Sequence, residues 1–109
     1  MNTINDTTKM KIVVIGAGSI GKRHISVIKR SKNLKLVGVA DNNLSAESVV
    51  QLAGVPFFTD YNLMLSKTRP HGAVIATPTE LHFLPAMAAL DYGVDLLIEK
   101  PISANMNEA

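Results

Sequence analysis

The sequence predicts an α/β fold: a doubly wound parallel sheet of about five strands with helices on both faces. Two observations carry this prediction. Short apolar, often β-branched runs alternate along the chain with segments of helical periodicity, which is typical of βαβ units. The short runs are also almost continuously apolar, as expected of parallel strands that are covered on both faces.

Each predicted strand is a short apolar run bounded by glycine, proline or polar residues. The predicted strands are residues 11–15, 34–40, 56–59, 72–76 and 95–98. Helical patterns fill the segments between them. The predicted helices are residues 20–30, 45–52, 61–67 and 79–92, with a further one around 105–109. Asp60 is a candidate cap for the third helix, and Gly93 is a candidate stop for the fourth.

The composition excludes several classes of protein. Of 109 residues, 47% are hydrophobic and 18% are charged, which is globular rather than disordered. The chain has no cysteine, which excludes cysteine-bound zinc, iron–sulfur clusters and thiol nucleophiles, and we expect no metal site. No apolar run approaches the roughly 18 residues of a membrane helix, and no secretory signal is evident. We expect a cytoplasmic protein without a membrane partner, with a disordered tail over residues 1–9.

The net charge of +2 arises from 11 basic and 9 acidic residues. The basic residues gather early, at Lys22, Arg23, Lys29, Arg30, Lys32 and Lys35. A nucleic-acid-binding module would add aromatic stacking groups, but the tyrosines and phenylalanines lie elsewhere. We therefore interpret the cluster as a solvated helix face and expect no nucleic-acid partner.

A glycine-rich loop carries the strongest motif. Residues 16–21 read GAGSIG and match G-x-G-x-x-G between a predicted strand and a predicted helix. That context indicates a Rossmann-type dinucleotide-binding loop rather than an ordinary strand–helix turn. Gly16 permits the tight turn, Gly18 lets backbone amides approach a pyrophosphate, and Gly21 lets the helix pack close to the strand. The free N–H groups at the start of the helix attract phosphate.

Asp41 lies 20 residues after Gly21, at the end of the second predicted strand. A carboxylate there accepts hydrogen bonds from an adenosine ribose and disfavours a 2′-phosphate. NAD is therefore the predicted cofactor. NADP is the alternative, because Lys22 and Arg23 lie near enough in sequence to reach a 2′-phosphate. A turn or helix-capping role is the other interpretation of Asp41.

Two further segments follow the fourth and fifth predicted strands, at residues 76–82 and 99–101. Because ligands gather at the carboxyl ends of strands in open α/β sheets, both segments should face the crevice of the glycine loop. A lysine at such a strand exit, Lys100, suits an anionic or hydroxyl-bearing substrate or proton donation. A solvated lysine is the alternative.

Taken together, these motifs resemble the N-terminal part of the glucose–fructose oxidoreductase, inositol dehydrogenase and MocA (Gfo/Idh/MocA) family of NAD(P)-dependent oxidoreductases. The segments that carry the resemblance are, in order, GAGSIGKRH at 16–24, VGVAD at 37–41, ATPTELH at 76–82 and EKP at 99–101. The resemblance covers residues 11–109.

The resemblance implies a role for each matching residue. The pyrophosphate would be held by Gly16, Gly18, Ser19, Ile20 and Gly21. The ribose would be held by Asp41, and the rest of the cofactor would be lined by Thr77, Pro78, Thr79, His82 and Glu99. Lys100 would contact the substrate at the hydride-transfer centre.

The implied reaction is hydride transfer between a nicotinamide cofactor and a small polyhydroxylated, sugar- or inositol-like substrate, in a homo-oligomer. Family members continue into a second domain that supplies most substrate contacts. We therefore expect residues 10–109 to be a dinucleotide-binding domain cut short, inactive by itself and lacking the C-terminal substrate domain. A non-catalytic dinucleotide-binding regulatory or sensor protein is the alternative.

Overall fold

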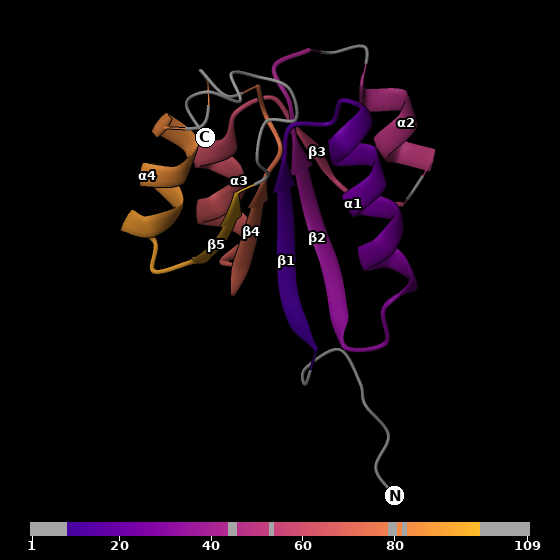
Figure 1. Ribbon diagram of the computed structural model, residues 1–109, viewed down its shortest axis with the longest axis horizontal. Coiled ribbons are helices and arrows are strands. Elements are labelled where there is room, and N and C mark those ends of the chain that lie inside the picture. Colours follow the sequence, from indigo (N-terminus) through magenta and orange to yellow (C-terminus); the bar gives the residue numbers. More distant parts are fainter. Residues whose placement is uncertain (1–8, 44–45, 53, 79–80, 82, 99–109) are drawn as a thin grey trace, which may run out of the picture.

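The structure, a computed structural model, describes residues 9–43, 46–52, 54–78, 81 and 83–98 (Figure 1). Five strands form one sheet: β1 (Met10–Ile15), β2 (Leu34–Ala40), β3 (Phe57–Phe58), β4 (Gly72–Ile75) and β5 (Asp95–Ile98). They lie in the order β3-β2-β1-β4-β5, and every neighbouring pair is parallel. The predicted doubly wound parallel sheet is confirmed.

In the described part of the chain, four helices cover the sheet: α1 (Ser19–Arg30), α2 (Glu47–Leu52), α3 (Tyr61–Thr68) and α4 (Phe83–Asp91). Helices α1 and α2 lie on one face, and α3 and α4 lie on the other (Figure 1). None of these helices is long and apolar enough to cross a membrane, as far as the described residues extend.

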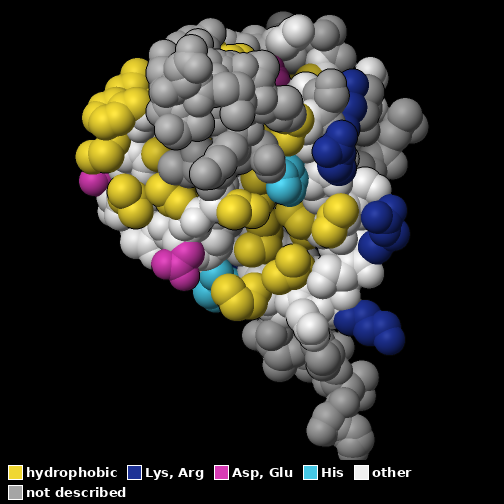
Figure 2. All heavy atoms as spheres, in the orientation of Figure 1, with side chains coloured by type: hydrophobic (Ala, Val, Ile, Leu, Met, Phe, Trp, Pro, Cys, Tyr) yellow, Lys and Arg dark blue, Asp and Glu magenta, His cyan; other side chains and the backbone are white. Residues whose placement is uncertain are grey.

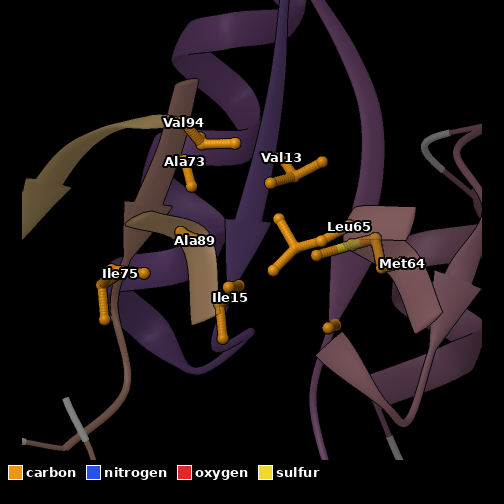
Figure 3. Close-up of a cluster of buried hydrophobic side chains, with 9 residues drawn as sticks. Val13, Ile15, Met64, Leu65, Ala73, Ile75, Ala89 and Val94 are labelled. Carbon is orange, nitrogen blue, oxygen red and sulfur yellow. The ribbon is translucent and has the colours of Figure 1, made fainter. Parts of the chain in front are cut away.

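Two hydrophobic clusters, one on each face, hold the layers together. Because side chains alternate along a strand, Val13 and Ile15 of β1 enter the cluster under α3 and α4, whereas Val14 enters the cluster under α1. Figure 3 shows the first cluster, in which side chains from β1, β4, α3 and α4 meet. Met64 and Leu65 of α3 are fully buried at its centre.

Helix α3 begins where the sequence predicts. The Asp60 carboxylate accepts hydrogen bonds from Asn62 N at 2.8 Å and Leu63 N at 3.4 Å, which caps the helix. The helix ends at Thr68, and its C-cap Arg69 has a φ of 46°, in the left-handed region.

Most of the predicted strand boundaries lie within one residue of those in the structure. The strand predicted over residues 56–59 is reduced to Phe57–Phe58. The fourth helix was predicted over residues 79–92, and the structure describes α4 over Phe83–Asp91. Residues 79, 80 and 82 lie outside the described residues, so the predicted start stays a prediction. The predicted helix around 105–109 and residues 1–8 of the predicted tail lie outside the described residues.

On the α1 side of the sheet, an apolar hollow of about 340 Å³ lies beside α1 and over β4 and β5. Its lining includes Ile12, Leu34, Val27 and Leu97. Figure 2 faces this region and shows hydrophobic side chains gathered between two histidines. Val27 of α1 is 51% exposed, and Leu97 of β5 is 55% exposed. No described element packs over these two side chains.

Candidate functional site

The strand order of the sheet reverses beside β1, between β2 and β4. The chain leaves β1 for β2 and β3 on one side, then returns to β4 on the other side of β1. In open α/β sheets, ligands bind at such a reversal point, outside the carboxyl ends of the strands. The glycine loop follows β1 at this point.

Gly16 is held between the two strands that flank β1. Its N–H donates to the Ala40 carbonyl at the end of β2 at 2.8 Å, and Ala76 N donates to the Ile15 carbonyl at 2.8 Å. The φ of Gly16 is +104°, and an added Cβ would lie 2.7 Å from Thr77 N. Glycine is therefore required here both by the backbone conformation and by the approach of the segment after β4.

Gly21 and Gly18 differ in what surrounds them. A Cβ on Gly21 would overlap the Gly16 carbonyl oxygen, so this glycine lets α1 pack directly on the loop. A Cβ on Gly18 would meet nothing within 4 Å. The space in front of Gly18 is therefore open, and this is the position where the fingerprint requires close approach to a pyrophosphate.

The start of α1 suits an anion. Gly18 is the N-cap, and no side chain caps the helix. The first turn holds no acidic residue, and Lys22 and Arg23 follow it. The first amides of a helix lack intrahelical acceptors, so here they remain able to bind phosphate oxygens. The open space and the uncapped amides together fit a dinucleotide.

Asp41 lies directly beside this loop. Its Oδ2 accepts a hydrogen bond from Ala17 N at 2.7 Å, and its Oδ1 accepts one from Asn43 N at 2.8 Å. Its own N–H donates to the Phe58 carbonyl at 3.0 Å, which continues the pairing of β2 with β3. The half-buried Asp41 carboxylate thus links the end of β2 to the glycine loop through Ala17 N. Its bond with Asn43 N also forms a turn after β2, which was the other interpretation of Asp41.

The segment after β4 reaches the glycine loop. Thr77 N lies against Gly16, as the glycine packing shows, and the Thr77 hydroxyl donates to the Leu81 carbonyl at 3.2 Å. Leu81 N in turn donates to the Pro78 carbonyl at 2.8 Å. The structure therefore brings together three predicted parts of the site: the glycine loop, Asp41 and the turn at Thr77 and Pro78.

The other predicted site residues are not placed. Thr79, His82, Glu99 and Lys100 lie outside the described residues, and for Ser19 only the backbone is described, as the first residue of α1. Ile20, the second residue of α1, is half-buried. The described residues contain no group of three or more acidic or histidine side chains able to hold a metal ion.

The hydrogen bond from the Ala17 amide to Asp41 could not be predicted from residue types. A backbone N–H exists at every residue except proline, so no residue type marks the one that meets Asp41. The spacing from Gly21 to Asp41 predicts only that loop and carboxylate lie at the same edge.

Residues 10–109 match the family model of Gfo/Idh/MocA, described as an oxidoreductase family with an NAD-binding Rossmann fold. The chain belongs to this family. The resemblance inferred from the motifs is confirmed, as are the Rossmann fold and its NAD-binding character.

Three known proteins illustrate the relationship. Glucose-6-phosphate 3-dehydrogenase of Bacillus subtilis (strain 168) is 35% identical over 100 residues, covering 91% of this chain and 28% of the relative. Inositol 2-dehydrogenase of Arthrobacter sp. (strain FB24) is 30% identical over 106 residues, covering 94% and 32%. The third is the WlbA dehydrogenase from Bordetella pertussis, whose crystal structure was solved in complex with NADH and UDP-GlcNAcA. That structure aligns with this chain with a TM-score of 0.78 and 28% sequence identity, and the alignment covers 92% of this chain and 31% of that chain. This chain therefore spans about a third of the length of these family members.

Proposed function

We propose that the chain supplies the NAD-binding site of an oxidoreductase that transfers a hydride between nicotinamide and a carbon bearing a hydroxyl group in a polyhydroxylated substrate. The observation that carries the proposal is the open space in front of Gly18 at the uncapped start of α1, in a loop whose Ala17 amide is bound by Asp41. NAD supplies the hydride acceptor when bound.

Each part of the site has a proposed task. The amides at the start of α1 bind the pyrophosphate, because they lack acceptors and lie at the positive end of the helix dipole. Asp41 accepts hydrogen bonds from the adenosine ribose and repels a 2′-phosphate, so NAD is preferred to NADP. Thr77 and Pro78 line the cofactor from the end of β4, and Thr79, His82 and Glu99 extend this lining. Lys100 orients the substrate hydroxyl.

The substrate class rests on the relatives. Two of them are named as dehydrogenases of glucose 6-phosphate and of inositol, which supports a sugar- or inositol-like small molecule. Because the chain spans about a third of these proteins, we propose that residues 10–109 act as a cofactor domain and that turnover needs a substrate domain of the kind relatives carry. The same proposal includes a cytoplasmic, homo-oligomeric enzyme.

Calorimetric titration of the folded chain with NAD⁺, NADH and NADP⁺ tests the proposal. We expect saturable binding of NAD⁺ and NADH and weaker binding of NADP⁺. Circular dichroism establishes that the sample is folded. A folded sample that binds neither NAD⁺ nor NADH would contradict the proposal.

A further inference from the structure

We infer that Asp41 is a positioning residue for the pyrophosphate as well as a ribose ligand, because its carboxylate fixes the amide of Ala17 in the glycine loop. The inference rests on the NAD site proposed above and deepens it. Its basis is the 2.7 Å hydrogen bond from Ala17 N to Asp41 Oδ2, which joins residues 24 positions apart.

The carboxylate is held from two sides. Oδ2 accepts from Ala17 N in the loop, and Oδ1 accepts from Asn43 N in the turn after β2. Hydrogen bonds to an ionised carboxylate are among the stronger ones in proteins, and a carboxylate offers about four acceptor sites. Two acceptor sites therefore remain for the ribose hydroxyls, while one of the others holds the glycine loop and the last holds the turn after β2.

The loop needs such a restraint at this peptide. Gly16 is anchored through its own N–H to Ala40, and its carbonyl oxygen packs against Gly21, so only van der Waals contact restrains the carbonyl end of the peptide that joins Gly16 to Ala17. The bond from Ala17 N to Asp41 adds a directional hydrogen bond at the amide end of the same peptide. Glycine tolerates both signs of φ, so this peptide is able to rotate more easily than one between other residues. The bond to Asp41 selects the orientation, and the following residue is the open Gly18.

The negative charge of Asp41, taken alone, predicts that this residue weakens the binding of an anion, which is the opposite of a positioning effect. A carboxylate within hydrogen-bond distance of the loop repels a pyrophosphate, so its removal would strengthen anion binding if Asp41 acted only on the ribose. If Asp41 positions the loop, its removal weakens anion binding instead. The sign of the change therefore separates the two roles.

The experiment titrates inorganic pyrophosphate, which has no ribose, into the full chain and follows the backbone amide signals of Gly18 and the first turn of α1 by NMR. We expect Asp41→Ala to weaken pyrophosphate binding by about fivefold, the loss expected for one hydrogen bond. Asp41→Asn should recover part of this loss, because its amide oxygen still accepts from Ala17 N. NAD⁺ binding should fall further in both variants, because the ribose contact is also lost.

Asp60→Ala is the matched control. Asp60 also accepts hydrogen bonds from two backbone amides, but it caps α3 and does not contact the loop. Pyrophosphate binding should be unchanged in this variant. An equal loss in Asp60→Ala and Asp41→Ala would overturn the inference, because the effect would then follow general destabilisation.

A ligand-free measurement keeps the inference separate from the proposed function. Amide hydrogen exchange should be faster at Ala17 and Gly18 in Asp41→Ala, and in Asp41→Asn if the alanine variant does not fold, but not in Asp60→Ala. Unchanged exchange at both amides, or pyrophosphate binding as tight as in the wild type, would overturn the inference. Wild-type protein that binds no NAD would instead contradict the proposed function and leave the exchange test valid.

Discussion

A single methyl group at Gly18 is expected to weaken cofactor binding without unfolding the protein. In Gly18→Ala the new Cβ meets nothing within 4 Å, and the φ of −75° is one that alanine adopts readily. Loss of backbone freedom in the unfolded chain stabilises the variant by about 0.4–1 kcal/mol. Alanine is a poorer N-cap than glycine by about 0.5–1 kcal/mol, so the net change in the free energy of unfolding is close to zero.

The same methyl group occupies the space proposed for the pyrophosphate. We expect NAD⁺ to bind at least about tenfold more weakly, which corresponds to roughly 1.4 kcal/mol of lost binding free energy. Calorimetry measures the affinity, and urea denaturation measures the free energy of unfolding of the same sample.

Gly21→Ala is the contrasting variant. Its Cβ would overlap the Gly16 carbonyl oxygen, so α1 must move away from the loop. Forced overpacking of this kind costs about 1–3 kcal/mol, and the urea midpoint should fall accordingly. The reasoning would be refuted if Gly18→Ala bound NAD⁺ as tightly as the wild type, or if it lost as much stability as Gly21→Ala.

Three further predictions concern the core, a helix cap and the proposed substrate lysine. Met64→Ala should lower the free energy of unfolding by about 2–5 kcal/mol, because Met64 is fully buried. Leu63 on the same helix is 46% exposed, so Leu63→Ala should lower it by less than about 1 kcal/mol. Equal losses of the two variants in urea denaturation would contradict the burial assigned to α3. Asp60→Ala should cost about 1 kcal/mol, because two amides of α3 lose their acceptor, and an unchanged urea midpoint would argue against the cap. Lys100→Ala should leave NAD⁺ affinity within about twofold of the wild type by calorimetry, since Lys100 is assigned to the substrate; a larger loss would place it on the cofactor instead.

The fold could be predicted because its signals are local. Apolar runs ending in glycine, proline or polar residues mark strands, and the Asp60 cap marks the start of α3. The exposure of Val27 could not be predicted, because helical periodicity reports which side of a helix is apolar, not whether another element covers that side.

The candidate site could be predicted only in part, because a sequence shows residue types and their spacing but not which backbone groups meet. The glycines and Asp41 are distinctive residue types at a distinctive spacing, so they could be found in the sequence. The contact of Thr77 N with Gly16 and the bond from Ala17 N to Asp41 involve backbone groups that every residue carries. Such contacts depend on how the ends of β1, β2 and β4 are arranged in space.

The apolar hollow beside α1 has a practical consequence for every titration described above. Exposed apolar surface of this kind promotes association between molecules as protein concentration rises. Cooling weakens hydrophobic contact, while sulfate and phosphate strengthen it. Those two anions also bind at the starts of helices, so they would compete with a dinucleotide at α1. The titrations should therefore be made with cold, dilute protein in a chloride buffer. Under these conditions the chain should not self-associate, and no sulfate or phosphate should compete for the amides at the start of α1.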